Sequence, residues 1–286
     1  MLKRISFALL TLLLASCNMP GSTTFAPPSS DTPSPAIEFP TTGPEQPAAT
    51  LAETGPALEA IVILQPGLNS FIVSPVTVEG QSRPTFEQNL VVAIYGEDGA
   101  RLAQQPTTLD SPAGEPGNYS IEVSFEVGSE QPGRISVYET SALDGGIVHL
   151  SSVEVTLTVG EAVITPPTLG LESIDIQAPA PMMEISGGVF TVSGFSDYFF
   201  ESNLGLVLCG GGGSGAPNDL CGTEDNVLAS GNAMIDAPDV GMSGPFSGEL
   251  TYSVSEPTPA RIVVFAASPR DGGWMHVSSI PILLSP

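Results

Sequence analysis

Apolar and polar residues alternate in short segments along the chain, and this alternation predicts β-strands. In YSIEVSFEV, residues 119–127, every second residue from Ile121 to Val127 is apolar, and the residues between them are Ser or Glu. A period of two is that of a strand with one buried face. Turn sequences such as GEDG, AGEPGN and LDGG separate these segments, and no window keeps a helical period. Roughly seven short strands per hundred residues is typical of an immunoglobulin-like β-sandwich.

The strand pattern is present twice. FEQNLVVAI, residues 86–94, corresponds to FESNLGLVL, residues 200–208, at an offset of 114. A longer block, residues 132–157, corresponds to residues 259–284 at an offset of 127. We therefore predict an all-β fold with two tandem immunoglobulin-like β-sandwich domains.

An insertion in the second copy carries two of the three cysteines. The offset grows by 13 residues between the two blocks, and CGGGGSGAPNDLC, from Cys209 to Cys221, is 13 residues long and lies in that interval. Because the thiol of Cys17 is expected to carry a lipid, as the N-terminal pattern described next indicates, the remaining pair is even, and in an exported chain it predicts a disulfide. A zinc site is disfavoured there because C-x11-C has no nearby His or second Cys pair.

The N-terminal segment, residues 1–17, has the pattern of a lipoprotein signal peptide. Two basic residues precede an apolar run from Ile5 to Ala15, which is too short to span a membrane. The run ends in LASC, which resembles the lipobox of bacterial lipoproteins, and in that family Cys17 would become the lipidated first residue. An uncleaved anchor, or an ordinary signal with an incidental Cys, is the alternative. We expect an extracytoplasmic protein that is lipid-anchored to the bacterial cell membrane, at the cell surface or in the periplasm.

Composition indicates the remaining boundaries. Residues 18–57 are rich in Pro, Ser and Thr and hold too little apolar surface to fold, so we predict a disordered tether. The first domain is predicted at 58–160, a linker at 161–171, and the second domain, with its disulfide-closed insertion, at 172–286. An extended tether of this kind would hold the two domains away from the membrane.

The net charge restricts the partners. The formal charge is −24 at pH 7, with 31 acidic residues against 7 basic ones. Lys3 and Arg4 lie in the predicted signal peptide, so the mature chain would keep only arginines as basic residues. A surface this acidic repels phosphate, which argues against nucleic-acid binding and against polybasic docking on anionic lipid.

Each copy also shares a set of motifs with a known domain. An opening strand ends in Pro (IVILQP and IDIQAP) and is followed by V/F-T-V-x-G-x-S, an N-L strand, a P-x-R-I-x-V strand and D-G-G. In these motifs the chain resembles the immunoglobulin-like domain of bacterial spore-germination proteins, often called Gmad2. The resemblance covers about 58–158 and 172–286, and the first copy matches more closely because it keeps GEDG. It implies a binding or scaffolding module at the outer face of a bacterial cell, with no catalytic residues to carry over and no implied role in germination.

The repeated motif D-G-G-x-x-H-x-S-S contains both histidines of the chain. Its residues are Asp144, Gly145, Gly146, His149, Ser151 and Ser152 in the first copy, and Asp271, Gly272, Gly273, His276, Ser278 and Ser279 in the second. The residue types suggest a catalytic triad or a metal site. However, residues two apart on a strand are ~6–7 Å apart, too far for a direct Ser–His hydrogen bond, and no Ser lies on a strained elbow. We predict a structural element in which D-G-G makes a turn, the Ser pair carries a β-bulge that explains a change of apolar phase, and the imidazoles are partly exposed.

The remaining signals are weaker. Asp98 in GEDG and Asp219 in APNDL are candidate calcium ligands, but an EF-hand spacing is missing and acidic turns are usually solvated. We therefore predict no cofactor, no metal site and no catalysis. The leading hypothesis is a lipid-anchored protein that presents its two domains to an unknown protein or cell-envelope ligand. The alternatives are an exported hydrolase or hydrolase accessory subunit, with a site between the domains, and a passive spacer.

Overall fold

The computed structural model describes residues 57–286, so the predicted signal peptide, Cys17 and nearly all of the predicted tether lie outside the described residues. Within residues 57–286, no helical segment has both the length and the hydropathy that a membrane span requires. Strands and turns, with three short 3-10 segments, make up the regular structure there, as the alternating sequence predicts. All described residues belong to one compact unit.

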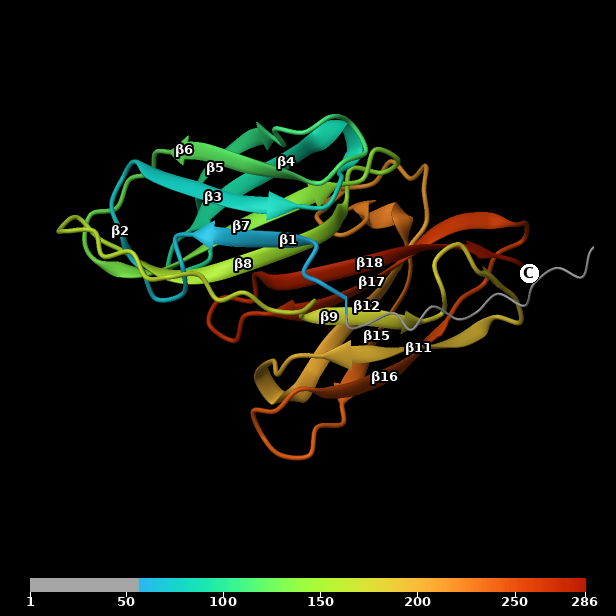
Figure 1. The fold of residues 1–286 in the computed structure, drawn as a ribbon. Helices are drawn as coiled ribbons and strands as arrows, with labels where there is room; N and C mark the ends of the chain where they lie inside the picture. The colour runs from blue at the N-terminus through green and yellow to red at the C-terminus, as the bar shows by residue number, and fades with distance from the viewer. Residues whose placement is uncertain (1–56) are drawn as a thin grey trace, which may run out of the picture. The chain divides into compact units, whose positions relative to one another are not determined.

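The first sandwich is built from eight strands in two sheets (Figure 1). The strands are β1 (Ile61–Gln65), β2 (Phe71–Ile72), β3 (Val76–Ser82), β4 (Asn89–Tyr95), β5 (Arg101–Thr108), β6 (Gly117–Val123), β7 (Gln131–Thr140) and β8 (Ile147–Leu157). One sheet has the order β1-β3-β6, and the other contains β5-β4-β7-β8. A 3-10 segment, η1 (Phe86–Gln88), leads into β4.

The second sandwich repeats this arrangement with one insertion. Its strands are β9 (Ile174–Ala178), β10 (Glu184–Ile185), β11 (Val189–Ser196), β12 (Asn203–Cys209), β15 (Val227–Ile235), β16 (Gly244–Thr251), β17 (Thr258–Ala267) and β18 (Trp274–Leu284), with η2 (Phe200–Ser202) before β12. The insertion between β12 and β15 contains β13 (Pro217–Asn218), β14 (Gly222–Thr223) and η3 (Glu224–Asn226). Here β16 pairs with both β11 and β15, which joins the two sheets at that edge. The prediction of an all-β fold with immunoglobulin-like sandwiches is confirmed.

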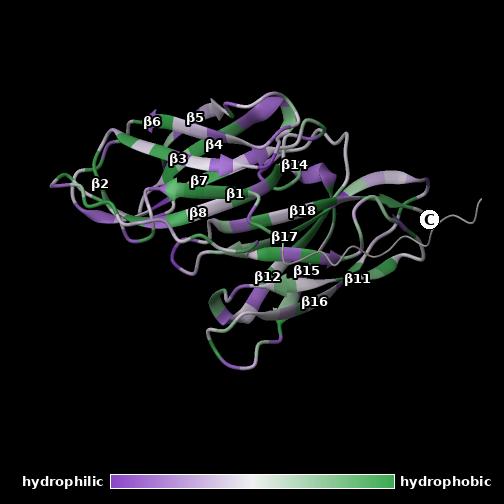
Figure 2. Cartoon of the chain, viewed as in Figure 1, coloured by the Kyte–Doolittle hydropathy of each residue, from purple (hydrophilic) through white to green (hydrophobic). Residues whose placement is uncertain are grey.

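Each sandwich encloses its own apolar core. In β3 buried and exposed residues alternate, and Val76 and Val78 point inward. They pack with Leu90 and Val92 of β4 and Ile135 of β7, and Figure 2 shows hydrophobic and hydrophilic residues alternating along several strands. The second sandwich has a separate core of its own strands. Because burying one aliphatic side chain contributes ~1.5–3 kcal/mol, these cores are the main apolar contribution to folding.

The two sandwiches also share one sheet. The free edge of β8 pairs antiparallel with β18, so that Leu150 lies opposite Val277 and Ser151 lies opposite His276. Leu150 and Val277 are equivalent residues of the two copies, because they are 127 positions apart. A local twofold axis therefore passes between the copies at this pair, as in an isologous dimer. The pairing also removes two strand edges that would otherwise be exposed.

The predicted bulge at Ser151 and Ser152 is wrong. Both residues pair in regular register with β7, and the extra residue, without a partner opposite it, is Val148. In the second copy the extra residue is Met275. The change of apolar phase has another cause, because β8 is buried on both faces. Leu150 packs in a cluster that contains residues of both sandwiches, whereas apolar residues after the Ser pair pack in the core of the first.

Candidate functional site

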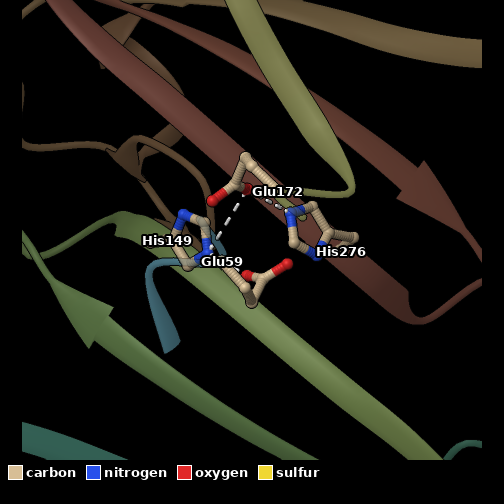
Figure 3. A group of neighbouring side chains, drawn as sticks. All are labelled: Glu59, His149, Glu172 and His276. Carbon is tan, nitrogen blue, oxygen red and sulfur yellow. Dashed lines mark hydrogen bonds and ion pairs between the residues drawn. The ribbon is translucent and has the colours of Figure 1, made fainter. Parts of the chain in front are cut away.

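Four ionisable side chains meet where the two sandwiches join. His149 lies on β8 and His276 on β18, while Glu59 and Glu172 lie just before β1 and β9 (Figure 3). Nε2 of His149 is 2.9 Å from Oε1 of Glu59, and Nε2 of His276 is 2.9 Å from Oε1 of Glu172. The two rings meet edge to face with their centroids 5.1 Å apart. We call these four residues the His–Glu cluster.

Both imidazoles are buried, so the prediction that they are partly exposed is wrong. His149 is 7% exposed and His276 is 4% exposed. Each ring is covered by the other ring and by a carboxylate from a segment that lies far away in the sequence. The alternation of a single strand does not report this cover, because the ring comes from the other domain and the carboxylate from a segment outside the strand.

The hydrogen bonds of the cluster cross between the domains. Glu59 accepts from Ser151 Oγ of its own domain, at 2.8 Å, and from the backbone N–H of Ser173 in the second domain, at 3.3 Å. Glu172 in turn accepts from the backbone N–H of Ala60, at 3.1 Å. Each carboxylate is therefore held both by the His of its own domain and by the backbone of the other domain.

The sequence prediction did not include the two glutamates. A signal was present, because ALEAI, residues 57–61, corresponds to GLESI, residues 170–174, and in each copy one residue separates Leu-Glu from the first strand. A charged residue in front of a strand normally stays in solvent, so its position alone gives no reason to expect burial. The only sequence signal for these glutamates is that each copy repeats one Glu at the same position, as each copy also repeats one His.

The environment of the cluster favours charged side chains. Burial opposes the carboxylate form of Glu59, but the hydrogen bond from His149 and the positive charges of His276 and His149 outweigh burial and lower the pKa of Glu59 to about 2. Burial also opposes the imidazolium form of His276, but the hydrogen bond to Glu172 and the nearby carboxylates raise its pKa. Glu59 is therefore ionised at neutral pH, and the protonated form of His276 is favoured relative to a free imidazole.

A half-open cleft of about 280 Å³ lies beside the cluster. Its lining includes Glu59, Ser151, Asp197 and His276 together with apolar residues of β1. Ser151 Oγ donates to a carboxylate oxygen. Among residues 57–286 no hydrogen bond joins a Ser hydroxyl to an imidazole, which is the contact that activates a serine nucleophile.

The Asp of each D-G-G turn binds an Arg of the other domain. Nη1 of Arg134, on β7, is 3.1 Å from both carboxylate oxygens of Asp271. Nη2 of Arg261, on β17, is 3.2 Å from Oδ2 of Asp144. Both carboxylates are buried. Burial opposes ionisation of Asp271, but hydrogen bonds from the backbone N–H of Gly273 and from Arg134 outweigh it and lower the pKa of Asp271.

Each D-G-G turn requires glycine at both positions, but for different structural reasons. Gly145 and Gly272 have φ values of +75° and +70°, in the left-handed region that other residues disfavour. Gly146 and Gly273 have no room for a Cβ, which would clash with the carbonyl oxygen of Leu220 in the first case and with the guanidinium of the opposing Arg in the second. In both cases the obstructing group belongs to the other domain.

The Ser pair also joins the domains. Ser152 Oγ donates to the carbonyl of Met275, and Ser279 Oγ donates to the carbonyl of Val148, both at 2.6 Å. The acceptors are the two extra residues of the strand irregularities. Ser278, the equivalent of Ser151, is buried. The two copies of the D-G-G-x-x-H-x-S-S motif thus bind each other, and we call these contacts, with the Arg–Asp pairs, the domain joint.

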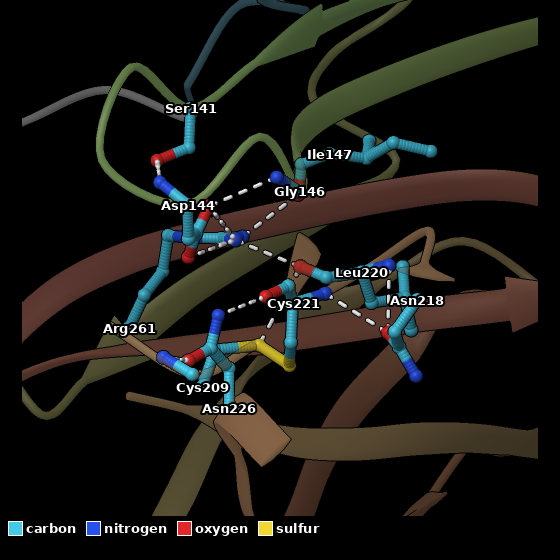
Figure 4. Close-up of a disulfide and its surroundings, with 11 residues drawn as sticks. Ser141, Asp144, Gly146, Ile147, Cys209, Asn218, Leu220, Cys221, Asn226 and Arg261 are labelled. Atoms are coloured by element: carbon cyan, nitrogen blue, oxygen red, sulfur yellow. Dashed lines mark hydrogen bonds and ion pairs between the residues drawn. A yellow bond between two sulfur atoms is a disulfide. The ribbon is translucent and has the colours of Figure 1, made fainter. Parts of the chain in front are cut away.

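Cys209 and Cys221 form the predicted disulfide, and the loop that it closes contacts the first domain (Figure 4). Both cysteines are fully buried in the apolar cluster between the sandwiches. The carbonyl of Asp219 accepts from the first N–H of β8, at 2.7 Å, and the carbonyl of Leu220 accepts from Arg261, at 2.7 Å. The insertion is therefore part of the domain joint.

The two candidate calcium ligands lie elsewhere. Asp98 and Asp219 are exposed, and Oδ1 of Asp98 accepts a hydrogen bond from the backbone N–H of Ala100 within its turn. In the described part of the chain, the group of side chains close enough to hold one metal ion is the His–Glu cluster, to which neither Asp belongs.

Comparison with known proteins identifies the first domain. Residues 60–146 match the family model Gmad2, described as the immunoglobulin-like domain of bacterial spore germination. The first sandwich is a Gmad2-like domain. The match spans β1 to β7 and the D-G-G turn of this Gmad2-like domain, so it contains the Arg and Asp that bind the second domain. No curated protein matches the chain.

Solved structures resemble the chain only weakly. Red sea bream transglutaminase is 12% identical with a TM-score of 0.27, over 80% of this chain and 32% of that one. Dimeric latent PorU from Porphyromonas gingivalis is 10% identical with a TM-score of 0.24, over 79% of this chain and 24% of that one. A chimeric titin Z1Z2 tandem is 15% identical with a TM-score of 0.18, over 79% and 98%. The chain thus spans a third or less of the first two proteins, and scores this low carry no argument about function.

Proposed function

We propose that the chain is a lipid-anchored extracytoplasmic protein whose two immunoglobulin-like domains act as one rigid body that binds or positions a protein or cell-envelope ligand, without catalysis. The observation that carries this proposal is the domain joint. A shared sheet, two buried Arg–Asp pairs and crossed hydrogen bonds connect the domains. The Gmad2 family match supports a non-catalytic binding or scaffolding role.

A fixed orientation of the domains favours a binding role over a passive spacer. A spacer needs only length, which a proline-rich tether supplies by itself. Buried charge pairs add little net stability compared with apolar packing, but they are satisfied in one arrangement only. A ligand that contacts both domains then binds without the entropic cost of ordering them.

In the alternative hypothesis of an exported hydrolase, the cleft beside the His–Glu cluster would be the active site. This cleft lies at the domain boundary, as the hypothesis requires. The cleft of about 280 Å³ is slightly smaller than the roughly 300–1,000 Å³ of ligand pockets. The hydroxyl of Ser151 and the imidazole of His276, which both line the cleft, each bind a carboxylate rather than each other. The contacts therefore support binding better than acyl transfer.

The test of the proposed role uses the full chain as bait on detergent-solubilised envelope. A partner identified in this way is then measured with purified components, against the wild-type chain and against Asp271→Ala, which loosens the joint. We expect the variant to bind at least tenfold more weakly. Equal affinity of the two chains would mean that ligand binding does not depend on the arrangement of the domains. Turnover of an ester or peptide substrate by the purified chain would favour the hydrolase.

Lipid anchoring has its own test. Cys17→Ser should release the protein from the membrane fraction or stop its processing, because the thiol is the acceptor of the lipid. Ser16→Ala is the matched control, since it keeps a small residue before the Cys. Unchanged membrane partition of Cys17→Ser with a normal mature mass would contradict the lipoprotein assignment.

A further inference from the structure

The His–Glu cluster has the geometry of a metal-binding site. Its four ligand atoms, one from each side chain, all lie within 4.8 Å of one another. Nε2 of His149 is 2.9 Å from Oε1 of Glu59 and 3.7 Å from Oε1 of Glu172. In a tetrahedral zinc site with bonds of ~2.0–2.1 Å, neighbouring ligand atoms are about 3.3 Å apart. The observed separations bracket that value, so small side-chain rotations suffice to surround one ion.

The chemistry of the ligands selects the class of ion. Two carboxylates carry two negative charges, which one divalent cation neutralises, whereas an unpaired buried charge is costly. Calcium and magnesium prefer oxygen ligands alone. Imidazole nitrogens together with carboxylate oxygens suit zinc and its first-row neighbours.

The surroundings hold the ligands in place and leave them accessible. The backbone N–H groups of Ser173 and Ala60 bind the Oε2 atoms of Glu59 and Glu172, so that the Oε1 atoms face the imidazoles. Ser151 supports Glu59 as well. Outer contacts of this kind orient the ligands of metal sites. The cleft lined by Glu59 and His276 provides the route from solvent.

We infer that Glu59, His149, Glu172 and His276 together bind one first-row divalent transition-metal ion of the zinc class, which ties the two domains to each other. Each domain supplies one His and one Glu. Four protein ligands complete a tetrahedral shell and leave no position for a substrate, so the ion is structural. This inference goes beyond the proposed function, because metal binding depends neither on the lipid anchor nor on a ligand.

Titration with zinc tests the assignment directly. The full chain is used without a polyhistidine tag and in a Cys17→Ala background, because the other two cysteines are disulfide-bonded. Calorimetry should show one Zn²⁺ per chain, and Co²⁺ should give the visible absorption of a tetrahedral site. His149→Gln, His276→Gln, Glu59→Gln and Glu172→Gln should each weaken zinc binding at least ~10-fold, because loss of even an outer-shell partner of a ligand costs about 10–100-fold.

The chain offers matched controls. Glu87 and Glu201 are exposed and occupy equivalent positions in the two copies. Glu87→Gln and Glu201→Gln remove the same charge as the cluster variants and should leave zinc affinity unchanged. If these controls weaken binding as much as the cluster variants do, or if the four cluster variants bind as tightly as the parent chain, the assignment is wrong.

A second measurement does not depend on the folding of any variant. The chain contains two histidines, and both belong to the cluster, so ¹⁵N spectra of the imidazole rings report on this site alone. Zinc should shift both pairs of ring nitrogens with the same one-to-one stoichiometry. Imidazole signals that do not move at saturating zinc, or movement of only one ring, would overturn the inference.

Discussion

In the domain joint, the Asp of each D-G-G turn is covered by a segment of the other copy, and the two covering segments differ in structure. In the first copy a short turn, Gly96–Gly99, follows β4, and Gly99 lies against Asp271 of the second domain. In the second copy the disulfide loop follows β12, and Gly222 lies against Asp144 of the first domain. The twofold arrangement is therefore kept, while the segment that covers each Asp has changed.

This difference changes the surroundings of the two arginines. Arg134 lies over the ring of Tyr95, with its Cζ 5.3 Å from the ring centroid, and its Nε has no hydrogen-bond partner within residues 57–286. Cys209 stands at the position equivalent to Tyr95, and Arg261 instead donates to the carbonyls of Ile147 and Leu220. The insertion has thus turned an ion pair beside an aromatic ring into a network with backbone acceptors. Arg261 therefore depends less on its Asp than Arg134 does, because it has two backbone acceptors as well.

The largest expected effect comes from breaking the first of these pairs. Removing one partner of a buried ion pair costs about 3–5 kcal/mol, because the other charge stays buried and unpaired. Asp271→Ala should lie in that range, and Asp144→Ala should cost less, since Arg261 keeps its two carbonyl partners. Urea unfolding of the two variants measures the difference. A larger loss for Asp144→Ala would show that Arg261, and not Arg134, depends more on its carboxylate partner.

The same Arg134–Asp271 pair should make the stability of the protein depend on pH. The pKa of Asp271 is lowered from its ordinary value of 3.8, so its contribution to stability is fully present above that value and is lost as the pH falls through the folded-state pKa. The wild-type free energy of unfolding should therefore fall below about pH 4, and Asp271→Asn should lose less over the same range. Identical acid sensitivity of the two proteins would show that this carboxylate is not stabilised by the joint.

Loss of the disulfide should have the next largest effect. Replacing Cys209 and Cys221 by Ser should cost about 3 kcal/mol, the value for a loop of this length in the chain-entropy model. Because the loop is part of the joint, amide exchange should also accelerate at the β8–β18 pairing, while the core of the first sandwich stays protected. Hydrogen exchange with mass spectrometry separates the two regions. Faster exchange confined to residues 209–221 would show that the loop does not support the joint.

The smallest loss of stability is expected from substitutions at the first glycine of each D-G-G turn, where the two copies have the same structure. Gly145→Val and Gly272→Val place a β-branched residue at a positive φ and should each cost about 1–3 kcal/mol. No atom lies within 4 Å of the added Cβ at either position, so the cost is backbone strain and should be equal in the two copies. Thermal melts of the two variants test this equality, and Gly145→Asn should cost less, because Asn tolerates the left-handed region.

Features that depend on local pattern or on repetition could be predicted from the amino-acid sequence alone. The alternation in residues such as Ile121 to Val127 reports burial of one strand face, which is why the all-β sandwich could be predicted. The repeat revealed two copies, and the change of offset located the insertion and its disulfide, which the structure confirms. The resemblance to Gmad2 was visible in the motifs, and the family match confirms it for the first domain.

The way in which the two copies meet, and with it the whole candidate site, follows from contacts that form only in the folded protein. Both faces of β8 are buried, so apolar residues occur on both faces of this strand. In the sequence of a single strand, a second buried face and a β-bulge give the same change of apolar phase. The irregularity was therefore expected at Ser151, whereas the structure has it at Val148. Burial of His149 and its contact with Glu172 depend on the pairing of β8 with β18. Strand edges present the same backbone groups whatever their sequence, so the choice of partner is set by side-chain contacts between residues more than 100 positions apart.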